Sequence, residues 1–343
     1  MGKKILVVES SAVIRRYIVT LLQKEGYELY SAKNLDDVKR YTHERFALAL
    51  VDITMDDALV IVQTLIQHAT LRVMILSTEG MDEKTMEALE LGALDAIKKP
   101  QKSVDIATVA PELVKKVRDS FVIFIQKRGT DELCFKEHNH IIDTNIEMGF
   151  VLIGASTGGP RLIEKICRSL PKGYPHAVCV VQHMPTDFTA NFARRLNSIS
   201  EVEVLEATNG MALKKGRVII AKGGMHLHIR KRLKDYVALL APNVQERFFV
   251  PSVDELFFSA SEVLPVQKIL AVELTGIGDD GADGMVALHN KGAYTLAESE
   301  ESAVVYGMPK EAALRGGATK VLSFNQILDE IIKYGQSNDV TRT

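Results

Sequence analysis

The first third of the chain alternates strand-like runs with segments whose apolar residues recur at helical spacing. The run at residues 5–8 is apolar throughout, which is typical of a strand buried on both faces of a parallel sheet. Further strand-like runs lie at residues 27–30, 46–51, 72–76 and 96–97, and helix-like segments separate them. This alternation predicts an α/β domain built on a doubly wound parallel sheet.

Polar residues stand at the carboxyl ends of four of these runs, namely Glu9, Asp52, Ser77 and Lys99. Ligands of doubly wound sheets bind beyond the carboxyl ends of the strands, so we expect these side chains to converge. Asp52 would accept a phosphoryl group, and Glu9 and Asp52 would hold Mg²⁺. The Ser77 hydroxyl would bond a phosphate oxygen, and Lys99 would pair with its charge. Each residue alone is better explained as an ordinary polar strand end, and only the set points to phosphoryl chemistry.

The second half of the chain repeats the pattern around a glycine-rich turn, which predicts a second doubly wound parallel sheet of Rossmann-like type. Its apolar runs lie at residues 150–153, 177–181 and 268–274. The turn after the first run has two interpretations. Gly154-x-Ser156-x-Gly158 matches a nucleophile elbow, in which a sharp turn exposes a serine hydroxyl. Gly154-x-Ser156-x-x-Gly159 is also close to a dinucleotide-binding loop.

The residues after the next two runs favour the serine chemistry. A dinucleotide site needs an acid near the end of the second strand to hold a ribose, and His183 stands there instead. The third run leads into a glycine-rich loop that contains Asp279, Asp280 and Asp283. An acid at that strand end could orient the histidine and stabilise its charged form. Calcium binding by Asp279 and Asp283 is an alternative, although the loop lacks the spacing of an EF-hand.

Composition limits the remaining possibilities. The 343 residues are 46% hydrophobic and 25% charged, ordinary values for a globular chain of about two domains. The formal net charge of -2 gives no reason to expect nucleic-acid binding. No signal segment or membrane-spanning run is visible, so we expect a cytoplasmic protein without membrane insertion. The three cysteines lack metal-binding spacing, and we interpret His138 and His140 as part of a solvated loop.

Residues 1–122 resemble the receiver domain of response regulators, which have a flavodoxin-like fold. Asp52 matches the phosphoacceptor of that family and Ser77 matches its hydroxyl position. Lys99 and Pro100 match the lysine that precedes a proline in receivers. The resemblance implies a histidine kinase as phosphodonor and Mg²⁺ as the ion needed for phosphorylation.

The chain departs from the receiver pattern in three places. Glu9 and Ser10 replace two adjacent acids, and Asp56 replaces a proline. Ala96 replaces the aromatic residue three positions before the lysine. Because one carboxylate is missing, we expect Mg²⁺ to bind more weakly than in other receivers. A receiver that is never phosphorylated is therefore an alternative.

Residues 148–337 resemble the catalytic domain of chemotaxis protein-glutamate methylesterases, and residues 123–147 would form the linker. The resemblance depends on five motifs in the order of that family. They begin at Gly154, Gln182, Pro251, Leu274 and Val305. One departure is Glu298, which stands where glutamine is common in the family.

The resemblance assigns roles to five residues of the second half. It implies that Ser156 is the nucleophile, that His183 is the general base and acid, and that Asp280 orients the histidine. The backbone N–H of Ile277 is a candidate donor to the oxyanion, and Thr157 is expected to bond near the histidine. No cofactor is needed for this chemistry.

The resemblance to a receiver-fused methylesterase also implies a function and its partners. The enzyme would hydrolyse methyl esters on the glutamates of a methylated chemoreceptor and release methanol, with deamidation of receptor glutamines by the same chemistry. The receiver would restrain the esterase until it is phosphorylated. Two alternatives are a non-enzymatic adaptor and an esterase that does not respond to phosphorylation. A monomer is the default expectation.

Overall fold

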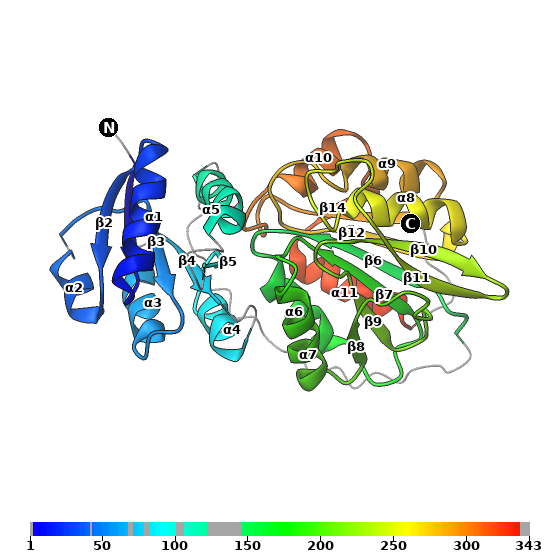
Figure 1. The fold of residues 1–343 in the computed structure, drawn as a ribbon. Helices are drawn as coiled ribbons and strands as arrows, with labels where there is room; N and C mark the ends of the chain where they lie inside the picture. The colour runs from blue at the N-terminus through cyan, green and yellow to red at the C-terminus, as the bar shows by residue number, and fades with distance from the viewer. Residues whose placement is uncertain are drawn as a thin grey trace. The chain divides into compact units, whose positions relative to one another are not determined.

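The chain divides into two compact units, Met1–Gly129 and Thr130–Thr343 (Figure 1). The computed structural model describes residues 3–41, 43–67, 71–78, 82–100, 106–121 and 146–336. The expected linker at residues 123–147 lies outside this described part except for Ile146 and Glu147, and so do Cys134 and the two histidines at 138 and 140. The exact domain boundary therefore stays a prediction.

The first unit is a five-stranded parallel sheet with strand order β2-β1-β3-β4-β5. This is the flavodoxin-like order, and it places the topological switch point between β1 and β3. The strands are β1 (Lys4–Val8), β2 (Glu28–Ala32), β3 (Leu48–Asp52), β4 (Arg72–Ser77) and β5 (Asp95–Lys98), and the helices are α1 (Ala12–Lys24), α2 (Leu35–Arg40), α3 (Ala58–Ile66), α4 (Glu83–Glu90) and α5 (Ile106–Ser120).

Helix α5 contains Pro111 in its interior and continues for nine more residues beyond it to Ser120. A proline inside a helix removes one main-chain hydrogen bond and costs about 3 kcal/mol. The side chains of Leu113 and Val117 follow it and are fully buried in the core of this unit, which offsets that cost.

The second unit has a seven-stranded parallel sheet with the order β14-β13-β12-β6-β7-β9-β8. Both parallel sheets confirm the predicted fold class. The strands are β6 (Phe150–Ala155), β7 (Ala177–Gln182), β8 (Glu203–Glu206), β9 (Arg217–Ile220), β12 (Ile269–Glu273), β13 (Tyr294–Glu298) and β14 (Lys320–Leu322). The helices are α6 (Gly159–Ser169), α7 (Phe188–Ile199), α8 (Val253–Val263), α9 (Ala282–Asn290), α10 (Met308–Leu314) and α11 (Phe324–Tyr334), with a 3₁₀ turn at Val266–Lys268.

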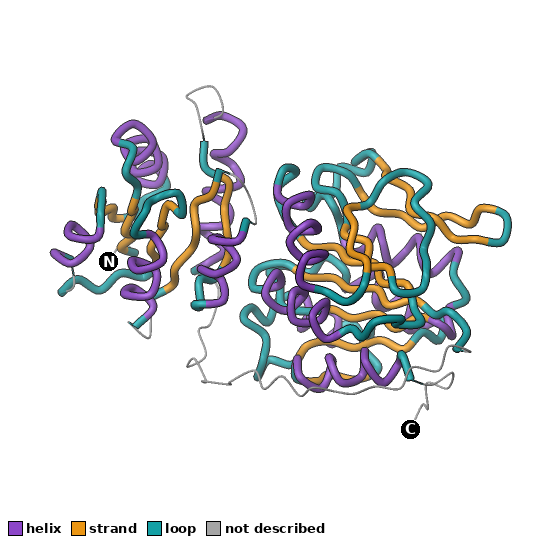
Figure 2. The backbone as a smooth tube through the Cα atoms, turned by 90° about the horizontal axis from the view of Figure 1, so that it is seen from below, coloured by secondary structure: helices purple, strands orange, loops and turns teal. Residues whose placement is uncertain are grey.

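Helices cover both faces of this sheet (Figures 1 and 2). Helices α8, α9 and α10 lie on one face, and α6, α7 and α11 lie on the other. An antiparallel hairpin of β10 (His226–Arg232) and β11 (Asp235–Ala241) packs against α8 outside the main sheet. None of the helices in the described ranges has the length and apolar character needed to cross a bilayer.

Candidate active site

The strand order of the second unit brings three loops together. Strands β7 to β9 lie on one side of β6 and strands β12 to β14 lie on the other side, so the switch point of the sheet lies between β6 and β12. Ser156 directly follows β6, His183 directly follows the neighbouring strand β7, and Asp280 lies in the loop after β12. The backbone N–H of His183 donates to the Ala155 carbonyl at 3.0 Å. The residues at the ends of β6 and β7 are therefore direct neighbours.

The turn that carries Ser156 depends on two glycines. Gly158 has a φ of 82°, in the left-handed region that glycine enters at little cost, and it allows the sharp reversal into α6. A Cβ on Gly159 would lie 2.2 Å from Gln182 Oε1, so a side chain there would displace Gln182. Gln182 in turn donates to the Ser156 carbonyl at 2.8 Å and fixes the backbone of the turn. The conformation that the nucleophile elbow requires is thus built into the local sequence.

The imidazole of His183 is held on one nitrogen only. Its Nε2 lies 2.8 Å from Asp280 Oδ2, while its buried Nδ1 makes no hydrogen bond within the described residues. The Phe249 ring stacks on the imidazole, with the ring centroids 4.0 Å apart and the planes 6° from parallel. The ring is therefore fixed in orientation and has one nitrogen available for proton transfer.

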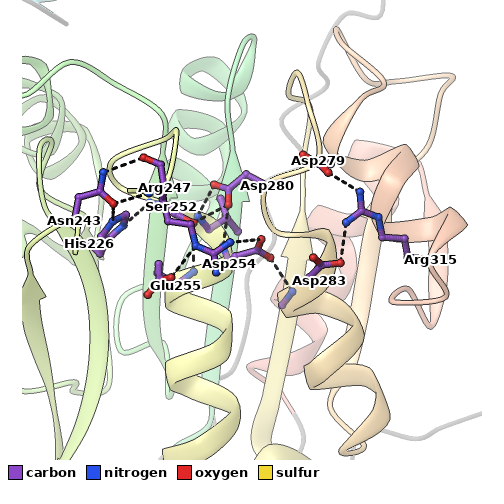
Figure 3. Close-up of polar contacts among 12 residues, drawn as sticks. His226, Asn243, Arg247, Ser252, Asp254, Glu255, Asp279, Asp280, Asp283 and Arg315 are labelled. Carbon is purple, nitrogen blue, oxygen red and sulfur yellow. Dashed lines mark hydrogen bonds and ion pairs between the residues drawn. The ribbon is translucent and has the colours of Figure 1, made fainter. Parts of the chain in front are cut away.

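The Asp280 carboxylate is surrounded by hydrogen-bond donors at the N-terminal end of α8 (Figure 3). Ser252 Oγ and the Val253 N–H donate to it at 2.7 Å each, and the Asp254 N–H donates at 3.3 Å. Burial opposes ionisation of this carboxyl, but the bonds from His183, Ser252 and Val253 outweigh it and lower the pKa of Asp280. The group is therefore a stable anion that can orient and stabilise a protonated imidazole.

The two other acids of this loop point elsewhere. Asp279 pairs with Arg315 at 2.5 Å and Asp283 pairs with the same guanidinium at 2.7 Å (Figure 3). Their side chains are 63% and 60% exposed, whereas Asp280 is buried. Within the described residues, no group of three or more His, Cys, Asp or Glu side chains is arranged to hold a metal ion, so the geometry gives no support to the calcium alternative.

The loop after β12 is tied closely to the serine turn. The Ser156 N–H donates to the Thr275 carbonyl at 2.9 Å, and the Thr275 hydroxyl donates to the Thr157 carbonyl at 2.9 Å. A Cβ on Gly276 would lie 2.9 Å from the Ser156 Cβ, so only glycine allows this approach. Ile277 follows, half-buried, and its N–H donates to no other residue in the described ranges. That N–H is available to a ligand.

The Ser156 hydroxyl makes no hydrogen bond to His183 in the part of the chain that the structure describes. Such bonds often shorten only when substrate is bound. Sequence reasoning missed two contributors to the site, Phe249 and Ser252. Ser252 could have been found from the Ser-x-x-Glu pattern that ends at Glu255, because this pattern marks a helix N-cap. No sequence signal marks Phe249.

The predicted phosphorylation site of the first unit also forms one cluster. Lys99 Nζ lies 2.7 Å from Asp52 Oδ2 and 3.1 Å from Glu9 Oε2, and all three side chains are buried. The Lys99 N–H donates to the Ser77 carbonyl at 2.9 Å. Asp52 Oδ1 accepts from the hydroxyl and the N–H of Thr54. Burial is the main cause that raises the pKa of Glu9.

Comparisons with known proteins match each unit to a protein family. Residues 151–331 match the family model described as CheB methylesterase, and residues 5–110 match the response regulator receiver domain. A protein-glutamate methylesterase/protein-glutamine glutaminase of Carboxydothermus hydrogenoformans is 37% identical, over 96% of this chain and 98% of the relative. One from Archaeoglobus fulgidus is 36% identical, over 96% of this chain and 97% of the relative.

A solved structure agrees with these matches. The crystal structure of the Thermotoga maritima CheB methylesterase catalytic domain superposes with a TM-score of 0.52 and 38% identity. The match covers 55% of this chain and 99% of that domain. The family inferred from the sequence motifs is thereby confirmed. The chain belongs to the CheB methylesterase family, as an enzyme with a response regulator receiver domain ahead of its methylesterase domain.

Proposed function

We propose that the chain hydrolyses glutamate methyl esters on a methylated chemoreceptor, with Ser156, His183 and Asp280 as its catalytic residues. The observation that carries this proposal is the bond between His183 Nε2 and Asp280, which leaves the buried Nδ1 as the base. The bond also fixes the tautomer, because Nε2 must keep its proton to donate to the carboxylate. The relatives named protein-glutamate methylesterase support the choice of substrate.

The reaction would proceed through an acyl-enzyme. Ser156 Oγ attacks the ester carbonyl carbon while His183 Nδ1 takes the hydroxyl proton. The carbonyl oxygen becomes an oxyanion, which the Ile277 N–H is available to stabilise. The carbon–methoxy bond then breaks, and methoxide leaves as methanol with the proton from His183. Water then attacks the acyl carbon while His183 takes a proton from it. The bond between Ser156 Oγ and the acyl carbon breaks, and His183 returns the proton to Oγ, which restores the Ser156 hydroxyl and releases the glutamate side chain as the free acid, which ionises to the carboxylate.

The same residues would deamidate receptor glutamines. The only change is the leaving group, which departs as ammonia after it receives the proton from His183. The names of the relatives, which pair the methylesterase with a protein-glutamine glutaminase, support this second reaction.

We also propose that a histidine kinase phosphorylates Asp52 and that this releases the esterase from inhibition by the receiver. The buried carboxylates of Glu9 and Asp52 are hard oxygen donors and fit Mg²⁺, which they would hold together. The bound ion would neutralise charge on the incoming phosphoryl group. Lys99 already pairs with both carboxylates and would pair with the phosphoryl oxygens once Asp52 is modified.

A methanol-release assay with methylated receptor tests the proposal. Wild type should release methanol, and Ser156→Ala should release almost none while keeping the wild-type unfolding temperature. Release that is no faster with either protein than without protein would favour the adaptor alternative, and equal release above that background would contradict the role of Ser156. Addition of a small phosphodonor with Mg²⁺ should raise the wild-type rate, and no change in rate would favour an esterase that ignores phosphorylation.

A further inference from the structure

Glu298 is a buried acid that the proposed reaction does not use. It is the last residue of β13, and its side chain is fully buried. Its Oε2 accepts the Thr275 N–H at 2.8 Å, and its Oε1 accepts the Ser302 hydroxyl at 2.9 Å. The Ser302 hydroxyl accepts the Phe324 N–H at 2.9 Å, which anchors this network at the start of α11. Both carboxyl oxygens are therefore engaged by groups of fixed position.

Thr275 is the link between Glu298 and the serine turn. Its carbonyl accepts the Ser156 N–H, and its hydroxyl donates to the Thr157 carbonyl, both at 2.9 Å. The same hydroxyl accepts the Val305 N–H at 2.8 Å. A single residue thus holds the backbone on both sides of the nucleophile.

The main chain at Thr275 needs a side-chain acceptor. Strand β12 ends at Glu273, and Leu274 makes the last main-chain bond to β6, through the Gly154 carbonyl. The Thr275 N–H is buried and bonds to the side chain of Glu298 instead of to a main-chain carbonyl of a neighbouring strand. A buried N–H without an acceptor is strongly unfavourable, so loss of Glu298 would make this loop move to find another partner.

We propose that Glu298 is a positioning residue for the reaction, which fixes Thr275 and through it the backbone of Ser156 and the Ile277 N–H. The inference rests on the proposed function, because it assigns Glu298 to the same site. Glu298 makes no hydrogen bond to Ser156 or His183 within the described residues, so its effect passes through the main chain of Thr275. A displacement of about 1 Å in reacting groups can lower a rate by about 100-fold.

The role requires an acceptor oxygen and not a charge. A glutamine at this position keeps an oxygen for the Thr275 N–H and gains an amide that can donate to the Ser302 hydroxyl. A leucine is one bond shorter but of comparable volume, and it offers no acceptor. The pair Glu298→Gln and Glu298→Leu therefore separates hydrogen bonding from packing. Glu164 supplies the control, because it is also buried but pairs with Arg168 of α6 and Arg195 of α7.

The experiment measures methanol release from methylated receptor by wild type, Glu298→Gln, Glu298→Leu and Glu164→Leu, each with its unfolding temperature. Glu298→Leu should lower kcat by about 10- to 100-fold with KM unchanged, because the substrate does not contact this residue. Glu298→Gln should stay within about threefold of wild type, and Glu164→Leu should keep the wild-type kcat. A wild-type kcat in Glu298→Leu, or an equal loss in Glu298→Gln, would overturn the proposal.

Hydrogen–deuterium exchange gives a readout that does not depend on turnover. Glu298→Leu should speed exchange of the Thr275 and Ser156 amides, while Glu298→Gln and Glu164→Leu should leave it unchanged. Unchanged amide exchange in Glu298→Leu would overturn the inference, even if the wild-type protein proved inactive. If the wild type is inactive but exchange in Glu298→Leu is faster than in the wild type, only the proposed function is overturned. If Glu298→Leu does not fold, Ser302→Ala replaces it. The Ser302→Ala variant removes the hydrogen-bond donor to Glu298 Oε1. It should also speed exchange of the Thr275 and Ser156 amides and lower kcat by about two- to fivefold.

Discussion

Replacement of Asp280 by asparagine removes the charge that faces His183 and changes little in size. Four donors converge on this carboxylate, from His183, Ser252, Val253 and Asp254. An asparagine has one oxygen, so its amide N–H₂ must face donors on one side. The variant would therefore both lose the anion that stabilises protonated imidazole and disturb the tautomer of His183.

The expected loss can be estimated from this geometry. Removal of the orienting anion in a serine–histidine–acid site lowers kcat by about 10⁴. At 1.36 kcal/mol for each tenfold change in rate, that is about 5 kcal/mol of transition-state stabilisation. The group is buried and receives short, charge-assisted bonds, so solvent screening does not reduce this figure much.

Asp279→Asn is the matched control, because the neighbouring carboxylate is 63% exposed and pairs with Arg315. We expect it to stay within about twofold of the wild-type kcat, since exposed pairs contribute little. The assay is methanol release at saturating methylated receptor, with circular dichroism to verify folding. A folded Asp280→Asn that keeps more than about a tenth of the wild-type kcat would refute the role given to Asp280, as would equal losses in the two variants.

Three further predictions follow from contacts elsewhere in the structure. Gly276→Ala places a Cβ 2.1 Å from Met308 Sδ, so we expect a stability loss of about 1–3 kcal/mol in urea unfolding and a kcat at least about tenfold lower. Burial raises the pKa of Glu298 from 4.5 to about 7, so the folded state holds this proton more tightly than the unfolded chain does. Wild type should therefore lose about 3 kcal/mol relative to Glu298→Gln as the pH rises from about 4.5 to about 7, and parallel pH–stability curves would contradict this. Incubation with a small phosphodonor and Mg²⁺ should add one phosphoryl group to the chain, measured by intact-mass spectrometry. The Asp52→Asn substitution or a metal chelator should abolish this adduct, and an adduct that persists in either case would contradict Mg²⁺-dependent phosphorylation of Asp52.

Much of the fold and the site geometry could be predicted because parallel sheets obey simple rules. Continuous apolar runs identify buried strands, and polar residues directly after them must lie at one rim of the sheet. This reasoning brought Glu9, Asp52 and Lys99 together in the first unit, where the structure places all three side chains within ion-pair distance. It also placed His183 and Asp280 at one rim in the second unit, where they are hydrogen-bonded.

The parts that could not be predicted depend on irregular backbone and on burial of polar groups. The hairpin of β10 and β11 turns at Leu233, which has a φ of 55° and is 91% exposed. A leucine gives no turn signal, because this conformation usually selects glycine or asparagine. Phe249 reaches His183 from the loop before α8, and loop paths are not set by periodicity. Glu298 was visible in the sequence, but its burial and its bond to Thr275 depend on how β12 and β13 pair in the fold.

The central claim is that Ser156 carries the acyl group during turnover. The most direct measurement is rapid acid quenching of wild type during hydrolysis of a methylated receptor peptide, followed by peptide mapping by mass spectrometry. The account predicts a covalent adduct of the peptide without its methoxy group on Ser156, absent from Ser156→Ala. Methanol release at the wild-type rate from Ser156→Ala, or an adduct that maps to another residue, would contradict it.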